Sequence, residues 1–105
     1  MSKQKIAVPP QKIADICHRW KVTEFSLFGS VLRDDFRPDS DVDVLVTFAP
    51  NSRVSLFSLV QMEDELKNLF GRDVDLVERA AIEKSENYIR RKSILSNAQV
   101  VYVAG

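Results

Sequence analysis

Apolar residues recur at intervals of three and four positions in several stretches of the chain, which is the spacing of one face of a helix. The pattern predicts a first helix over residues 11–20, and two prolines just before it suit its entry. A second helix is predicted over 54–70 and ends at Gly71, a residue type common at helix C-termini. A third helix is predicted over 82–96.

Four other stretches are short and rich in β-branched or aromatic residues, and some alternate between apolar and polar positions as strands do. They predict strands over 24–28, 41–48, 73–77 and 99–103. The strand over 41–48 begins with two aspartates and a leucine on one face and three valines on the other. Residues 31–36 have room only for a turn or two of helix before the next proline.

Helices and strands alternate along the chain, which predicts the α/β or α+β class with one mixed sheet flanked by helices. The pattern leaves the order of the strands open. A chain of 105 residues has the length of one compact domain, and no repeat, linker or low-complexity tract divides it. We therefore expect residues 1–105 to form a single domain.

Charge and cysteine usage narrow the functional classes. Fifteen Lys and Arg residues balance fifteen Asp and Glu residues, which argues against binding of long nucleic acids through general phosphate neutralisation. No apolar run approaches the roughly 20 residues that span a bilayer, and the N-terminus lacks the apolar core of a signal peptide. Cys17 is the only cysteine, so an internal disulfide is excluded. We expect a cytoplasmic protein without membrane contact.

The strongest candidate for chemistry is the pair Asp41 and Asp43 at the start of a predicted strand. Side chains two residues apart on a strand project from the same face, so this pair concentrates negative charge in one place. Oxygen ligands of this kind suit Mg²⁺, whose remaining positions are filled by water and substrate phosphates. The pair therefore predicts a site for a metal-nucleotide complex.

A third carboxylate, Asp75, lies in the next predicted strand. If that strand neighbours the first, Asp75 joins the same face and serves as a further metal ligand or as the base for an attacking hydroxyl. Asp73 shares this face by the same alternation, but it stands at the start of the strand, where a solvated turn residue is the commoner outcome. We therefore favour Asp75.

Gly29 and Ser30 follow a predicted strand and precede a short helical segment, a position where backbone N–H groups offer an anion site. Glycine permits close approach of a phosphate, and the serine hydroxyl can donate to a phosphate oxygen. Arg33, one turn further, either supplies a fixed positive charge for the phosphates or braces the turn.

Each of these signals is common by chance when it stands alone, and their order along the chain is what favours a shared site. For several other residues a structural role is favoured: the only histidine, His18, has no partners at metal-ligand spacing, and Trp20 and Phe25 are expected in the core. Two interpretations stay open for the basic residues at 90–92 together with Lys84. They form either a solvated helix face or a contact for nucleotide phosphates or an acidic partner.

The spacing from Gly29-Ser30 through ten intervening residues to Asp41-Val42-Asp43 resembles the G-S-x10-D-x-D signature of the DNA polymerase β-like nucleotidyltransferase superfamily. An arginine three residues after the serine, a serine before the first aspartate, the apolar run after the second, and the later Val-Asp-Leu-Val are similar to the short members, called minimal nucleotidyltransferases or MNT domains. The likeness covers residues 28–103.

The resemblance implies the polymerase β-like fold, a mixed sheet with flanking helices. It also implies Asp41, Asp43 and Asp75 as ligands of Mg²⁺, and Gly29 and Ser30 as the site of the nucleotide phosphates. One departure is Asp34, which stands where many members carry a glycine after the arginine and places an acid near the phosphate turn.

Proteins of this length resemble the antitoxin of the HEPN/MNT toxin-antitoxin pairs. The family implies transfer of AMP from ATP to a tyrosine of the HEPN ribonuclease toxin, which silences the toxin. Two alternatives are an antitoxin that neutralises its partner by binding alone and a nucleotidyltransferase acting on a small-molecule hydroxyl. The second usually has an added helical domain, for which this chain is too short, and zero net charge disfavours a nucleic-acid-binding regulator.

Overall fold

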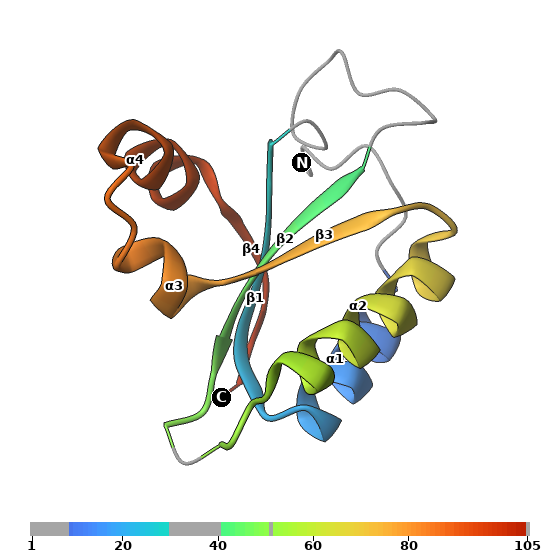
Figure 1. Cartoon of the computed structure of the whole chain (residues 1–105). Coiled ribbons are helices and arrows are strands. Elements are labelled where there is room, and N and C mark those ends of the chain that lie inside the picture. Colours follow the sequence, from blue (N-terminus) through green and yellow to red (C-terminus); the bar gives the residue numbers. More distant parts are fainter. Residues whose placement is uncertain (1–8, 30–40, 51, 105) are drawn as a thin grey trace.

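The computed structural model of the chain describes residues 9–29, 41–50 and 52–104. The elements in this part of the chain follow one another in the order shown in Figure 1. They are α1 (Pro10–Arg19), β1 (Val22–Phe28), β2 (Val42–Phe48), α2 (Leu56–Phe70), β3 (Val74–Glu78), α3 (Arg79–Glu83), α4 (Tyr88–Asn97) and β4 (Gln99–Val103). The short helical segment expected at 31–36 lies outside the described residues.

The four strands form one mixed sheet in the order β3-β2-β1-β4. Strand β1 pairs antiparallel with both β2 and β4, whereas β2 and β3 run parallel. The expectation of one mixed sheet flanked by helices is confirmed. That residues 1–105 form a single domain stays a prediction.

Helices α1 and α2 lie side by side against one face of the sheet (Figure 1). This face carries the alternate valines of β2, at 42, 44 and 46, all of which are fully buried. They pack with buried residues of both helices and of the neighbouring strands, including Ile13, Ile16, Cys17, Phe25, Leu27, Met62, Leu66 and Val74. Burial of a valine or leucine side chain stabilises a fold by about 1.5–3 kcal/mol, so this face fixes how the strands lie.

The opposite face has a second, smaller apolar cluster. Phe28 of β1 and Leu45 of β2 pack there with Ile82 of α3 and Ile94 of α4. Figure 1 shows α3 and α4 gathered at one side of the sheet, away from α1 and α2. The rest of this face is therefore available to polar side chains of the central strands.

Most element boundaries follow the sequence pattern within two residues, and the differences have local causes. The predicted helix over 54–70 begins two residues later because Ser55 is its N-cap and accepts a hydrogen bond from the backbone N–H of Ser58 at 3.1 Å. The helix ends as expected at Gly71, which adopts a left-handed φ of 70°.

The helix predicted between residues 82 and 96 is confirmed only in part, because α4 occupies the second half of that range. The structure has two helices here, α3 and α4, with residues 84–87 between them. Asn87 begins α4 as an N-cap, since its Oδ1 accepts a hydrogen bond from the backbone N–H of Arg90 at 3.1 Å. An asparagine side chain competes with helical hydrogen bonding of its own backbone, and the apolar periodicity hides this break.

No helix in the described part of the chain is long and apolar enough to cross a membrane. Cys17 lies fully buried in the larger core, and burial raises the pKa of its thiol from 9.0 to about 12. The thiol is therefore protonated at neutral pH, and its role is packing rather than chemistry.

Lys21, which follows α1, has a left-handed backbone with φ of 58°. Its carbonyl accepts a hydrogen bond from the backbone N–H of Ala49 at 2.8 Å, which ties the turn to the segment after β2. The left-handed region strains residues other than glycine by roughly 1–2 kcal/mol. The sequence therefore places a lysine where glycine is the usual residue.

Lys21→Gly should relieve this strain and raise the free energy of unfolding by about 0.5–1 kcal/mol, after allowance for the greater freedom of glycine in the unfolded chain. Urea unfolding followed by circular dichroism measures the change. Lys12→Gly, inside α1, is the matched control and should lower stability by about 0.5–1 kcal/mol. Equal losses in both variants would contradict the strain at Lys21.

Cys17 should react with a soluble disulfide reagent at pH 8 at least ~100-fold more slowly in the folded protein than in urea, since both its accessibility and its thiolate fraction are low. Absorbance of the thiol released from the reagent follows this reaction.

The free energy of unfolding should fall as the pH rises above 9.0, because the unfolded thiol ionises there while the folded one stays protonated up to about 12. Urea unfolding at a series of pH values measures this change.

The reaction with the disulfide reagent also has a clear opposite outcome. A native rate close to the urea rate would show that this core opens readily.

Candidate active site

The parallel pairing of β2 with β3 sets Asp43 directly beside Asp75. Residues paired in register on neighbouring strands project from the same face, and such strands lie about 4.8 Å apart. The valines before and after Asp43 point into the larger core, so both aspartates emerge on the opposite face, which α1 and α2 leave uncovered. The two strands are thus neighbours, which is the condition that the sequence left open.

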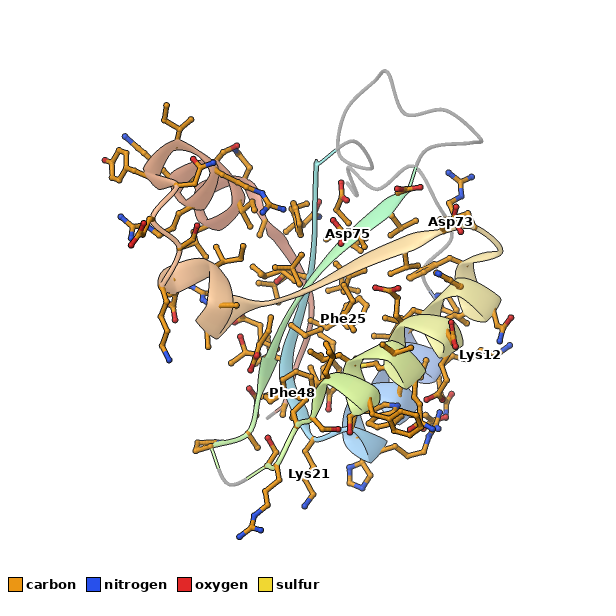
Figure 2. All side chains as sticks on the ribbon, in the orientation of Figure 1. Lys12, Lys21, Phe25, Phe48, Asp73 and Asp75 are labelled. Atoms are coloured by element: carbon orange, nitrogen blue, oxygen red, sulfur yellow. The ribbon has the colours of Figure 1, made fainter. Side chains whose placement is uncertain are left out.

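The remaining predicted acid, Asp41, precedes β2 by one residue and is exposed. Strand alternation places it on the same side as Asp43 if the extended backbone continues. Asp73 occupies the corresponding position before β3, and its carbonyl accepts a hydrogen bond from the backbone N–H of Val42 at 2.9 Å. Figure 2 shows Asp73 just before the start of β3 and Asp75 further along the strand, nearer the centre of the sheet.

Gly29, at the end of β1, lies against the carboxylate of Asp43. Phe28 pairs with Asp43 across the two strands, and the next residue, Gly29, has a left-handed φ of 74°. A Cβ atom at Gly29 would overlap Oδ2 of Asp43 and lie 3.1 Å from its Cγ. Glycine is therefore required both by the backbone conformation and by the nearby carboxylate.

Two of the predicted phosphate-binding residues, Ser30 and Arg33, lie outside the described residues, as does Asp34. Their roles stay predictions. Gly29 is described, and its closeness to Asp43 puts this one predicted phosphate-binding residue next to one predicted metal ligand.

The donor set is compatible with Mg²⁺, although it does not form a closed cage. No group of three His, Cys, Asp or Glu side chains within residues 9–29, 41–50 and 52–104 is arranged to hold one metal ion. Mg²⁺ in nucleotide-dependent enzymes needs only one or two protein carboxylates, because water and phosphate oxygens complete the octahedron. The adjacent Asp43 and Asp75 meet that requirement, and the absence of a side chain at Gly29 leaves room for the Asp43 carboxylate.

One residue near the site has no signal in the sequence. Glu63 of α2 accepts a hydrogen bond through Oε2 from the backbone N–H of Leu76 at 3.3 Å, one residue after Asp75. Strand β3 is at the edge of the sheet, and its outer edge pairs with no other strand. The contact gives the Leu76 N–H on that edge a hydrogen-bond acceptor. Glu63 is thus a positioning residue for β3, and only tertiary contact reveals it.

The residues expected to be structural are distributed as follows. Phe25 is fully buried in the core, whereas His18 is exposed at the end of α1. Trp20 is partly buried and donates a hydrogen bond from Nε1 to Oε2 of Glu65 at 2.6 Å. Among the basic residues of α4, Arg91 lies over the ring of Tyr88, with 5.5 Å between its Cζ and the ring centroid.

Comparison with known proteins assigns the family. A profile described as a nucleotidyltransferase domain matches residues 10–101. The protein adenylyltransferase MntA of Thermococcus cleftensis is 35% identical over 89 residues, which cover 85% of this chain and 82% of that protein.

Solved structures share the fold. A structure described as a candidate minimal nucleotidyltransferase is 28% identical, with a TM-score of 0.66 and coverage of 86% of each chain. A crystal structure of a toxin-antitoxin with AMP-PNP contains a chain with a TM-score of 0.69 and 17% identity, covering 92% of this chain and 75% of that one. The tri-AMPylated Shewanella oneidensis HEPN toxin in complex with MNT antitoxin contains another, with a TM-score of 0.61, 18% identity, and coverage of 90% and 70%.

The profile match spans nearly all the described elements and both predicted carboxylate strands. The chain belongs to the nucleotidyltransferase domain family.

Proposed function

We propose that this protein is a Mg²⁺-dependent adenylyltransferase antitoxin that transfers AMP from ATP to a tyrosine of a cognate HEPN ribonuclease toxin. The observation that carries the proposal is the in-register pair Asp43 and Asp75 beside the Gly29 turn. The relationship to the adenylyltransferase MntA supports the reaction class. The solved toxin-antitoxin complexes of similar fold support the choice of partner.

In this proposal Asp41 and Asp43 would hold the Mg²⁺ ions that accompany the triphosphate, with Asp75 as a further ligand or as the base for the acceptor. Gly29 and Ser30 would hold the nucleotide phosphates together with the guanidinium of Arg33. Bound Mg²⁺ would neutralise phosphate charge and stabilise the transition state of transfer. The carboxylates themselves fix where the triphosphate lies relative to the acceptor. Most of the rate then comes from positioning and charge stabilisation, since phosphoryl transfer requires little covalent work from the protein.

The transfer step balances without any further reactant. The tyrosine Oη forms a bond to the α-phosphorus of ATP, and the bond from that phosphorus to the bridging oxygen breaks. Pyrophosphate leaves with the electron pair of the broken bond. Asp75 orients the tyrosine hydroxyl or accepts its proton, which then passes to solvent.

The product explains how the toxin is silenced. An AMP group on a tyrosine beside the RNA-cutting site adds bulk and negative charge, and both oppose the approach of an RNA phosphate. We place this activity in the cytoplasm, where ATP, Mg²⁺ and toxin meet, and in one domain formed by residues 1–105.

Asp43→Asn and Asp75→Asn should each lower the rate of AMP transfer by at least ~100-fold, because each removes a charge that holds metal and phosphate in the transition state. Labelled ATP, Mg²⁺ and purified toxin, followed by mass spectrometry of the adduct, measure the rate. Asp64→Asn, an exposed substitution on α2, is the matched control and should keep the wild-type rate.

The same variants separate the proposal from neutralisation by binding alone. In cells that express the toxin, a catalytic antitoxin with Asp43→Asn should fail to restore growth, whereas Asp64→Asn should restore it. Rescue by the Asp43 variant at the wild-type level, with no adduct on the toxin, would replace the proposed enzyme by a binding antitoxin.

Gly29→Ala should lower the transfer rate by at least ~10-fold, because the added methyl group displaces the carboxylate of Asp43. Gly71→Ala is a close control: its φ is 70°, near the 74° of Gly29, but a Cβ there meets no atom within 4 Å. Both variants should lose roughly 1–2 kcal/mol of stability through left-handed strain, measured by urea unfolding. A Gly29 variant as active as the Gly71 variant would contradict the steric argument.

A further inference from the structure

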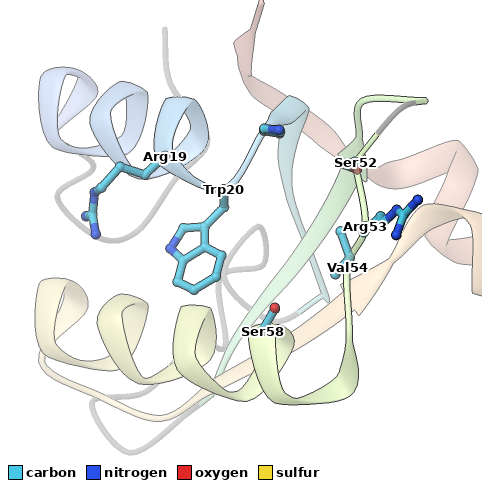
Figure 3. Close-up of a pocket in the computed structure, with 7 residues that line it drawn as sticks. Arg19, Trp20, Ser52, Arg53, Val54 and Ser58 are labelled. Atoms are coloured by element: carbon cyan, nitrogen blue, oxygen red, sulfur yellow. The ribbon is translucent and has the colours of Figure 1, made fainter.

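A second concave site lies where the end of α1, the turn at Lys21, the loop after β2 and the first turn of α2 meet. This pocket has a volume of about 450 Å³, within the range of small-molecule sites. Figure 3 shows Arg19 and Trp20 on one side, Ser52 and Arg53 on the other, and Ser58 of α2 below the indole ring.

The pocket is at the other end of the sheet from the aspartates. Val22 pairs with Phe48 at the pocket end of β1 and β2, whereas Phe28 pairs with Asp43 at the far end. A strand of seven residues spans about 20 Å. Figure 2 shows Lys21 at the bottom of the view and Asp75 well above it on β3, so the pocket is separate from the candidate active site.

The lining is cationic. Arg19, Lys21 and Arg53 contribute three positive charges, and the described residues that line the pocket include no acid. Arg19 forms an ion pair with Oε1 of Glu65 at 2.6 Å, and its side chain is still 58% exposed. In the described part of the chain, no carboxylate forms an ion pair with Lys21 or Arg53.

The aromatic wall of the pocket is held in place. Trp20 donates its indole N–H to one carboxylate oxygen of Glu65, and Arg19 contacts the other oxygen at 2.6 Å. The indole also packs against the larger core cluster, so its orientation is fixed on that side. Its remaining surface lines the pocket and offers a flat ring for stacking.

The backbone at Lys21 adds a separate argument. Its left-handed φ would suit glycine, and the side chain makes no ion pair within the described residues that offsets the strain. Strain retained at a residue with an exposed, charged side chain is typical of functional positions. The sequence thus keeps a positive charge at the edge of the pocket, at a position where the backbone by itself would favour glycine.

We propose that this pocket binds a nucleotide, with the phosphates near Lys21 and Arg53 and the base against Trp20. Cationic side chains match phosphate oxygens, and the indole matches a planar base. The ligand is a free mononucleotide or the phosphorylated end of a short RNA, which share this chemistry. Binding here needs no divalent cation, in contrast to the carboxylate site.

Trp20 is the only tryptophan, so its fluorescence reports on this pocket alone. The purified protein is titrated in EDTA and low salt with ADP, with a 5′-phosphorylated oligoribonucleotide, with pyrophosphate and with an acidic peptide. Saturable quenching by ADP or by the oligoribonucleotide is expected. Whichever of the two has the lower Kd shows whether the ligand is a free mononucleotide or an RNA end. No quenching by either would overturn the proposal, as would an acidic peptide or pyrophosphate that binds as tightly.

The double variant Lys21→Gln and Arg53→Gln should raise the Kd at least tenfold. A matched double variant on α4, Arg90→Gln and Lys92→Gln, removes the same charge elsewhere and should stay within twofold. Asp43→Asn should also leave the Kd within twofold, which separates this site from the active site. If Asp43→Asn raises the Kd and the double variant of Lys21 and Arg53 does not, the proposal is overturned, while the proposed function stays intact.

Discussion

The parallel register between β2 and β3 is the constraint on which the candidate active site depends. It is enforced from the core side, where Val42 and Val44 of β2 and Val74 of β3 are buried with α1 and α2. A slip of one residue would turn Asp75 into the core and a valine into water, which costs several kcal/mol. The hydrophobic effect on one face of the sheet thus determines the position of two charges on the other.

The acids also depend on what surrounds them on their own face. Phe28 and Leu45 flank Asp43 along the strands and pack with α3 and α4, so one side of the site is apolar. On the other side, Gly29 leaves room for the carboxylate where any side chain would overlap it. A carboxylate between apolar side chains and Gly29 keeps a defined position, and nucleotidyl transfer requires such positioning.

The formal net charge of the protein is zero, but positive and negative side chains are concentrated in different parts of the molecule. Asp43 and Asp75 lie side by side near the start of β2 and β3, and the pocket with Lys21 and Arg53 lies toward the other end of the sheet. A balanced composition argues against a surface that neutralises phosphates everywhere, but it does not limit a local cationic pocket, because fields at this range act over about one Debye length. Helix α2 joins the two ends, since its first turn borders the pocket and Glu63 contacts β3 beside Asp75.

The sequence by itself determined the helices and strands with strong periodicity, the end of α2 at Gly71, and the candidate aspartates, because strand alternation and helix capping are local properties. Local pattern was insufficient for the break between α3 and α4, where Asn87 caps a new helix within an apolar periodicity. Only the tertiary structure decided the strand order, the contact of Gly29 with Asp43, and the pocket around Trp20. Each of these joins residues far apart in the chain, and packing of the whole core selects such contacts.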